Sequence, residues 1–239
     1  MAKPAGRLDV LSSIAVISDV HSNLEALTEV LGKVQGFPLY CLGDIVGYGG
    51  SPNEVVQALR RRGAICVLGN HDYGVLTGDT SMFNARAAMA AQWTRTRLTG
   101  ESTEFLRSLP LERRETLGSV SAYFTHGSPD DRLWEYVDPT THFLLLGHYL
   151  RKVGASCMGF GHTHRPYSFS VEEGTVFNPG SVGQPRDGDP RASYSILTPK
   201  GTRVEVENHR VEYDVDAAAA AVRAVGLPEA LASRLYKGL

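Results

Sequence analysis

The sequence repeatedly places an apolar, strand-like run directly before a side chain that can bind a metal ion. The run Leu39–Leu42 ends at Gly43-Asp44, and the run Ser12–Ser18 ends at Asp19. A buried strand followed at once by a helix or loop delivers its last side chains to one edge of a sheet, where open α/β folds bind ligands. We therefore expect these side chains to converge on one site. The complete set of such endings is Asp19 and His21, Asp44, Asn70 and His71, His126, and His162 and His164.

The first third of the chain alternates strand and helix patterns. The strand 12–18 precedes a helix that starts after Ser22 or Asn23 and runs to about Gly32. The strand 37–42 precedes a helix over 53–62, and the strand 64–68 leads to Asn70. This repeated order of strand, site residue and helix predicts an α/β fold that begins with parallel strands.

Residues 74–109 are helical in composition and separate one pair of candidate ligands from the next. We interpret them as a helical insertion that covers the site, with simple packing against the sheet as an equally good alternative. Strand patterns return from Leu111 and include 119–125. A helix is then expected over 139–153 and a strand over 155–160.

The last third predicts short strands near 167–171, 175–177, 193–197 and 203–207. Their spacing favours a second, mainly antiparallel sheet. Two Ala-rich helices over 214–225 and 228–235 form a C-terminal extension at about 214–237, which we expect to pack on the sandwich rather than on a partner chain. The simplest account of residues 1–239 is a single domain with two sheets face to face and helices outside.

Composition excludes several classes of protein. The chain has 239 residues, 42% of them hydrophobic, and a formal net charge of −2, which gives no support for a protein that holds nucleic acid through a broad basic surface. Cys41, Cys66 and Cys157 lie inside apolar runs without CxxC spacing, which predicts buried free thiols. With no secretory signal or membrane-spanning run, we expect a cytoplasmic protein that does not associate with membranes.

The residue types at the strand ends suit a metal site. Asp19 and His21 are two residues apart, so on an extended segment they would point to the same side and bind one ion together, and the same spacing recurs at His162 and His164. Asp44 supplies an anionic oxygen able to bridge two cations. Asn70 adds an amide oxygen and His126 another imidazole. This set is too large for one four-coordinate ion, and oxygen and nitrogen ligands without thiolate suit Mn, Fe or Zn.

Each of these residues has a structural alternative. Asp19 alone would serve as a helix cap, and Asn70 alone as a turn residue. For His142, His148 and His209 a structural role is preferred, because a lone histidine is more often structural than a ligand, and His148 has no second histidine two residues on. Structural roles do not explain why all five endings occur together, so the metal-site interpretation is favoured.

Five short motifs follow one another along the chain: Asp19-Val20-His21, Gly43-Asp44 with Gly47-Tyr48-Gly49, Gly69-Asn70-His71-Asp72, His126-Gly127 and Gly161-His162-Thr163-His164. In this order they resemble the motifs of the calcineurin-like metallophosphoesterase superfamily. The turn 178–183 also resembles small bacterial and archaeal members of the phosphodiesterase type.

The resemblance implies an α/β fold, a four-layer α/β/β/α sandwich of two mixed sheets flanked by helices. It implies two divalent ions, with Mn²⁺ favoured and Fe, Zn or Ni as alternatives. Asp19, His21 and His164 would hold the first ion, Asn70, His126 and His162 the second, and Asp44 would bind both. His71 would face the substrate and either protonate the leaving oxygen or stabilise charge on the phosphate, with Asp72 orienting its ring.

We therefore expect a hydrolase that cleaves a small or nucleotide-like phosphate ester by in-line attack of a metal-activated hydroxide. Tyr48 and Arg186 are candidate substrate contacts. The choice between monoester and diester, and the oligomeric state, are left open. A metal-dependent nuclease is less favoured because no basic groove is visible. The other alternative is a non-catalytic scaffold of the same fold, as in a retromer subunit, but such members lose the histidine that corresponds to His71.

Overall fold

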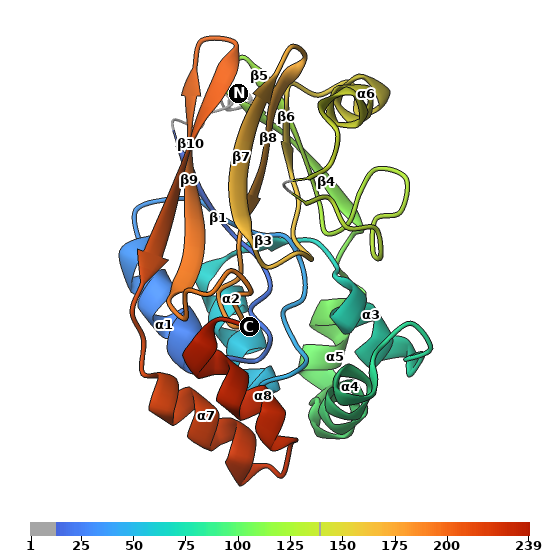
Figure 1. The fold of residues 1–239 in the computed structure, drawn as a ribbon, viewed down its shortest axis with the longest axis vertical. Helices are drawn as coiled ribbons and strands as arrows, with labels where there is room; N and C mark the ends of the chain where they lie inside the picture. The colour runs from blue at the N-terminus through green and yellow to red at the C-terminus, as the bar shows by residue number, and fades with distance from the viewer. Residues whose placement is uncertain (1–12, 139) are drawn as a thin grey trace, which may run out of the picture.

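The computed structural model describes residues 13–138 and 140–239. The expected strand starts at Ser12 and the expected helix at Pro139, and both of these first residues lie outside the described residues. The described chain forms two five-stranded sheets stacked face to face, with helices on the outside (Figure 1). Each sheet contains both parallel and antiparallel neighbours. The predicted α/β sandwich of two mixed sheets is confirmed.

The first sheet has the strand order β10-β9-β1-β2-β3. Its parallel part consists of β1 (Ile14–Ile17), β2 (Leu39–Cys41) and β3 (Ile65–Cys66). The strand β9 (Ala192–Lys200) runs antiparallel to β1, and β10 (Arg203–Val211) pairs with β9. The parallel strands therefore point their carboxyl ends at one edge of the sheet, as the strand and helix order predicted.

The second sheet has the order β4-β5-β6-β8-β7. Its central strands β5 (Val120–Thr125), β6 (Cys157–Gly159) and β8 (Gly174–Pro179) are parallel, and its edges β4 (Glu112–Leu117) and β7 (Pro166–Val171) are antiparallel.

The prediction that the late strands form a second, mainly antiparallel sheet is wrong. The strands β7 and β8 join the second sheet, whereas β9 and β10 extend the first. The local sequence pattern identifies a strand but not the strand with which it pairs. The strand β2 pairs with one edge of β1, and β9 pairs with the other edge and satisfies its hydrogen-bonding groups.

The hydrophobic core lies in three layers that follow from the alternation of side chains along the strands. Ile14 and Val16 of β1 face the second sheet, while Ala15 and Ile17 face the helices α1 (Leu24–Lys33) and α2 (Pro52–Arg62). A further cluster packs the second sheet against α6 (Phe143–Val153). Helices, sheet, sheet and helix thus form four layers.

Local sequence signals explain where these helices begin. The side chain of Asn23 caps α1 by accepting a hydrogen bond from the main-chain N–H of Ala26 at 3.0 Å. The helix α6 begins at Phe143, later than the expected start at 139, because His142 is its N-cap and accepts from the N–H of Leu144 at 3.2 Å.

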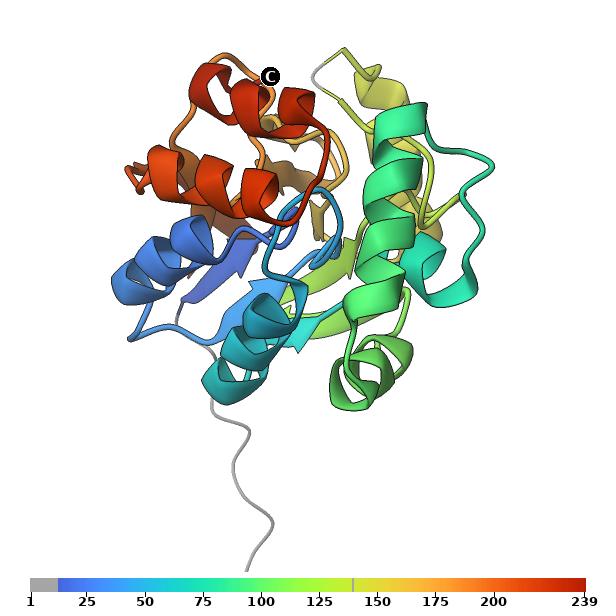
Figure 2. The ribbon, with the colours of Figure 1, turned by 90° about the horizontal axis from the view of Figure 1, so that it is seen from below.

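The helices of the middle and C-terminal regions meet beside the loop that follows β2. Residues 70–107 contain α3 (Asn70–Thr77), α4 (Ala85–Arg97) and α5 (Gly100–Arg107), and the chain closes with α7 (Val215–Ala224), α8 (Glu229–Ser233) and a short 3₁₀ helix (Arg234–Lys237). One hydrophobic cluster contains Tyr48, side chains of α4 and side chains of the C-terminal helices. Figure 2 shows α7 and α8 on one side of that loop and α4 on the other.

Cys41, Cys66 and Cys157 are free and buried, as expected. Within the part of the chain that the structure describes, every helix is too short or too polar to cross a membrane.

Candidate metal centre

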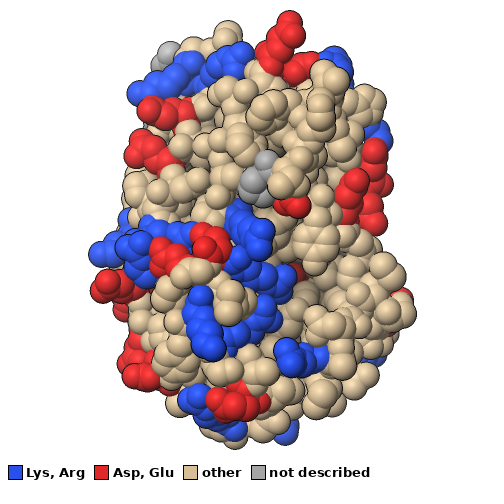
Figure 3. All heavy atoms as spheres, in the orientation of Figure 1, with Lys and Arg blue, Asp and Glu red and all other residues tan. Residues whose placement is uncertain are grey.

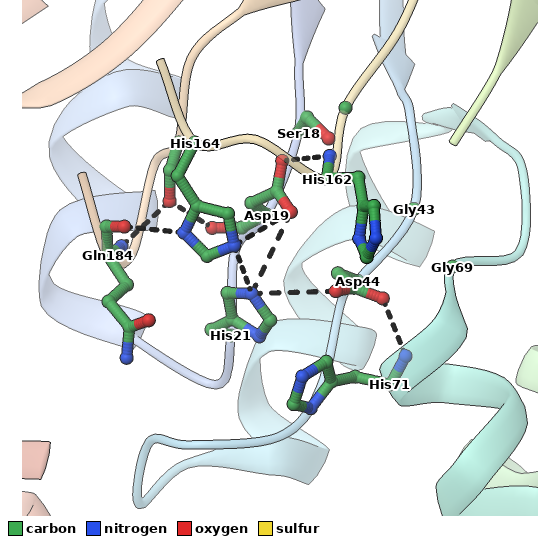
Figure 4. A network of polar contacts seen from close by, with 12 residues as sticks. Ser18, Asp19, His21, Gly43, Asp44, Gly69, His71, His162, His164 and Gln184 are labelled. Carbon is green, nitrogen blue, oxygen red and sulfur yellow. Dashed lines mark hydrogen bonds and ion pairs between the residues drawn. The ribbon is translucent and has the colours of Figure 1, made fainter. Parts of the chain in front are cut away.

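The polar strand ends lie together at the carboxyl edge of the two sheets (Figure 4). Asp19 follows β1, Asp44 follows β2, and His126 follows β5. Each of the seven side chains is at most 5% exposed, although all are polar. These residues are Asp19, His21, Asp44, Asn70, His126, His162 and His164.

The acidic and histidine side chains form two clusters that share one member. Ligand atoms of Asp19, His21, Asp44 and His164 all lie within 4.8 Å of one another, and so do those of Asp44, His126 and His162. The Oδ1 atom of Asn70 lies 3.0 Å from His126 Nε2, so it belongs with the second cluster. This division coincides with the two ligand sets that the motif resemblance implies.

Asp44 is the shared residue, and its two oxygens are in different environments. Oδ1 accepts a hydrogen bond from the main-chain N–H of His71 at 2.8 Å. Oδ2 is buried without a hydrogen-bond partner, 3.6 Å from His21 Nε2 and 3.4 Å from His126 Nε2. A buried carboxylate oxygen without a donor is costly unless a cation or proton satisfies it.

The first cluster has a second oxygen of this kind. Asp19 Oδ1 is buried without a hydrogen bond and lies 3.2 Å from His164 Nε2. Each cluster therefore presents an unsatisfied carboxylate oxygen surrounded by imidazole nitrogens. This donor set fits a pair of divalent metal ions bridged by Asp44.

Three of the histidines are held with the same nitrogen pointing into the site. The Nδ1 atom donates to a main-chain carbonyl in each case: His21 to Val46 at 3.2 Å, His126 to Leu42 at 2.7 Å and His164 to Gln184 at 2.6 Å. Such a contact sets the tautomer and orients the ring, so that Nε2 is free to bind a metal ion.

The backbone at the site has left-handed dihedral angles that are uncommon for residues other than glycine. The φ angles are 53° at Asp19, 48° at His21, 53° at Asp44, 66° at His162 and 59° at His164. Such strain persists only where the surrounding structure imposes it, and it concentrates at functional sites. Here the loops hold each other: the N–H of Asp19 donates to the Gly43 carbonyl, and the N–H of His21 to the Asp44 carbonyl, both at 3.0 Å.

These φ angles contradict the expectation that residues two apart lie on extended backbone and point to the same side. Asp19 and His21 meet in one cluster, with Oδ1 and Nε2 3.7 Å apart, but through left-handed rather than extended backbone. His162 and His164 do not act as a pair at all: His164 joins Asp19 and His21, whereas His162 joins His126. Left-handed backbone at both His162 and His164 turns the chain, so the two imidazoles point into different clusters.

Burial and neighbouring charges shift the pKa values of several side chains at the site. Burial alone would raise the pKa of Asp44, but the neighbouring histidines, His126 above all, outweigh it and hold that pKa well below its usual range. Burial would lower the pKa of His126, but the Asp44 carboxylate outweighs it and raises the pKa of His126 to about 9. Burial raises the pKa of Asp19 to about 7 and lowers that of His162 to about 3. At neutral pH, His126 therefore carries a proton that a metal ion would displace.

His71 lies outside both clusters and faces the cavity next to them. Its ring stacks on Phe83 at 4.5 Å and contacts the ring of Tyr48 at 4.4 Å, and it is 5% exposed. Gly47 packs against it: a Cβ atom there would lie 2.6 Å from His71 Nδ1, and the φ angle of 92° also requires glycine. Burial lowers the pKa of His71 to about 4, so the ring is neutral at pH 7.

The expectation that Asp72 orients the His71 ring is not met. The Asp72 carboxylate accepts from the main-chain N–H groups of Ile45 at 3.2 Å, Val46 at 3.0 Å and Gly69 at 3.1 Å. Consecutive residues of a helix point in different directions, so Asp72 faces the loop after β2 while His71 faces the cavity. Asp72 therefore positions that loop rather than the imidazole.

A cavity of about 290 Å³ opens beside the clusters. Tyr48 and Arg186, predicted as substrate contacts, both line it. Sequence reasoning missed seven further lining residues, among them Phe83, Trp134, Tyr136 and Arg234. Trp134 and Tyr136 follow the His126 motif closely enough to have been candidates, and Phe83 lies in the segment 74–109 that was expected to cover the site. Nothing in the sequence pointed to Arg234, far along the chain. His142, His148 and His209 do not line this cavity, as expected.

Comparisons with known proteins agree with this geometry. The calcineurin-like phosphoesterase superfamily domain matches residues 13–202. An uncharacterized protein of Methanocaldococcus jannaschii is 40% identical over 249 residues, covering 96% of this chain and 99% of that protein. A metallophosphoesterase of Sphaerobacter thermophilus has a structure with a TM-score of 0.80 and 36% identity, covering 96% of this chain and 100% of that one. A hypothetical protein of Pyrococcus horikoshii has the same fold, with a TM-score of 0.86 and 23% identity over 95% of this chain and 98% of its own.

Proposed function

Because this chain belongs to the calcineurin-like phosphoesterase superfamily, we propose that it is a dinuclear metal-dependent enzyme that hydrolyses a phosphate ester. The observation that carries the proposal is the position of Asp44 Oδ2, buried without a hydrogen bond between two histidine clusters. An enzyme that clamps the attacking and leaving oxygens of a phosphoryl group needs two cations held close together, and a shared carboxylate holds them so.

The proposed ligands are Asp19, His21 and His164 for one ion and Asn70, His126 and His162 for the other, with Asp44 common to both. When bound, such ions lower the pKa of water and offset negative charge on the phosphate. The mixed oxygen and nitrogen donor set, without thiolate, suits Mn²⁺, with Fe, Zn or Ni as alternatives.

His71 is proposed as the catalytic residue that contacts the phosphate. Its low pKa favours one of the two roles considered for it: a neutral imidazole stabilises charge by donating an N–H hydrogen bond rather than by giving up a proton from an imidazolium. The packing of His71 between Gly47 and Phe83 keeps its ring in place for this contact. Tyr48 and Arg186 line the same cavity and are proposed to bind the rest of the substrate.

The proposal is tested by loading the metal-free protein with Mn²⁺ and measuring bound metal together with hydrolysis of p-nitrophenyl phosphate and bis(p-nitrophenyl) phosphate. We expect two ions per chain and hydrolysis of at least one ester that stops on chelation. Two bound ions without hydrolysis of either ester would favour the scaffold alternative. Failure to bind metal would contradict the assignment of the site itself.

A further inference from the structure

Two arginines from distant parts of the chain lie close to one aromatic ring at the cavity. The guanidinium carbon of Arg186 lies 5.9 Å from the centre of the Tyr48 ring, and that of Arg234 lies 5.8 Å from it. Both arginines line the same cavity as His71 and His164. Arg234 belongs to the C-terminal segment, beyond residues 13–202 that match the superfamily domain.

The two guanidinium groups have no acidic side chain to neutralise them. Among residues 13–138 and 140–239, no aspartate or glutamate forms an ion pair with either one. Arg186 donates to Gln184 Oε1 at 3.0 Å, and its Nε is buried without a partner. Arg234 Nε donates to the main-chain oxygen of Leu239.

The surroundings of these arginines favour an anion between them. Burial, together with the positive charge of Arg186, lowers the pKa of the Arg234 guanidinium. Two partly desolvated like charges repel each other, and an anion that contacts both removes that repulsion. Arginine also forms paired hydrogen bonds with phosphate oxygens, for which the cavity leaves room.

The C-terminal segment is held firmly enough to place Arg234. Leu231 and Leu235, on either side of it, are 1% and 6% exposed and belong to the cluster that includes Ala87 and Ala90 of α4. The position of Arg234 therefore depends on packing between two helical regions that are far apart in the sequence.

Arg186 adjoins the first cluster of candidate ligands. Its main-chain N–H donates to the carbonyl of His164 at 3.2 Å, and His164 clusters with Asp19 and His21. The Tyr136 ring, which lines the same cavity, stacks on His162 at 3.9 Å.

Further basic residues lie beside Arg234 on the surface. Arg234 also lines a neighbouring open hollow together with Arg86 and Lys237. Figure 3 shows Lys and Arg side chains gathered on this face of the molecule. Positively charged side chains therefore line both the surface hollow and the cavity beside the candidate metal centre.

We propose that Arg186 and Arg234 form a second phosphate subsite, so that the substrate carries a further phosphate group beyond the one that is hydrolysed. This inference rests on the proposed function and narrows its substrate class to phosphate esters that carry at least two phosphate groups. The alternative role for the same arginines is to bind the phosphate that is hydrolysed, and the experiment distinguishes the two.

The test compares two ligands that differ by one phosphate group: adenosine 5′-monophosphate and the non-hydrolysable α,β-methylene adenosine 5′-diphosphate. Dissociation constants are measured by calorimetry on the Mn²⁺-loaded protein at fixed ionic strength and fixed free Mn²⁺. We expect the wild type to bind the diphosphate analogue about tenfold more tightly or better. In Arg186→Gln and in Arg234→Gln this preference should fall to about threefold or less, with binding of the monophosphate nearly unchanged.

Two controls separate this effect from loss of charge or of folding. Arg223→Gln removes a positive charge from the same C-terminal region, where Arg223 pairs with the exposed Glu229, and should keep the full preference. Arg234→Lys keeps the charge but loses the paired hydrogen bonds, so an intermediate preference is expected if the variant folds, as checked by its thermal unfolding.

Three results would overturn the subsite: no preference in the wild type, an unchanged preference in both glutamine variants, or an equal loss of affinity for both ligands. The last result would mean that the arginines bind the phosphate that is hydrolysed. Ester hydrolysis is measured separately with p-nitrophenyl phosphate and bis(p-nitrophenyl) phosphate. An arginine-dependent preference without any hydrolysis would therefore refute the proposed function and leave the subsite standing.

Discussion

The main-chain N–H of His71 donates a hydrogen bond to Asp44 Oδ1 at 2.8 Å. This contact directs the other oxygen of Asp44, Oδ2, towards the two histidine clusters. It also attaches the start of α3, which carries the His71 ring into the cavity, to the proposed bridging carboxylate. The proposed catalytic imidazole and the proposed shared ligand are therefore positioned by one another.

The first prediction concerns the shared carboxylate. Asp44→Asn keeps the size and the oxygen that accepts from His71, but it removes the negative charge needed between two cations. We expect at least one ion per chain to be lost and activity to fall by about 100-fold or more. Metal analysis and ester hydrolysis measure the two effects, and near wild-type activity with both ions bound would disprove the bridging role.

The second prediction separates His71 from the ligands. His71→Ala should lower kcat by about 100-fold, within the range for a group that acts in the transition state, while both ions stay bound. Loss of metal from this variant would mean that His71 is a ligand or a support for one. Because the ring is proposed to act as a neutral hydrogen-bond donor, His71→Gln should retain more activity than the alanine variant.

A third prediction tests the packing behind that ring. In Gly47→Ala the new Cβ would lie 2.6 Å from His71 Nδ1, at a backbone φ of 92° that alanine rarely adopts. We expect a displaced imidazole, a clear fall in kcat and retention of both ions. The matched control is Gly32→Ala in α1, where nothing lies within 4 Å and the helix should gain up to about 1 kcal/mol of stability. Equal activity of the two variants would show that the ring position does not matter.

The fourth prediction is a release of protons when metal binds. At pH 7 the metal-free protein carries a proton on His126, with a pKa of about 9, and part of one on Asp19, with a pKa of about 7. A ligand must lose its proton to bind, so loading should release about one to two protons at pH 7, and apparent metal affinity should rise with pH up to about 9. Calorimetry in buffers of different ionisation enthalpy measures this number, and a heat that is the same in all buffers would contradict it.

Much of the site was predictable from local sequence. The seven proposed ligands each follow an apolar run, and the structure brings all of them to one edge, because consecutive parallel strands end at the same side of a sheet. The start of α1 after Asn23 was equally local, since a cap acts within one helical turn.

Other features could not be read from the sequence because they depend on neighbours far along the chain. The pairing of β9 with β1 joins residues about 180 apart, and alternation along a strand does not say which edge the strand will find. The direction of Asp72 depended on the N–H groups of Ile45 and Val46, which only the folded loop after β2 presents.

The sequence by itself determined which residues form the site, since the motif residues and the strands before them are contiguous in the chain. Only the tertiary structure decided how the site is divided and what surrounds it. Left-handed backbone sends His162 and His164 into different clusters, and packing of the C-terminal helices on α4 brings Arg234 to the same Tyr48 ring as Arg186. Loop conformation and helix packing result from the sum of many long-range contacts, and no short motif encodes them.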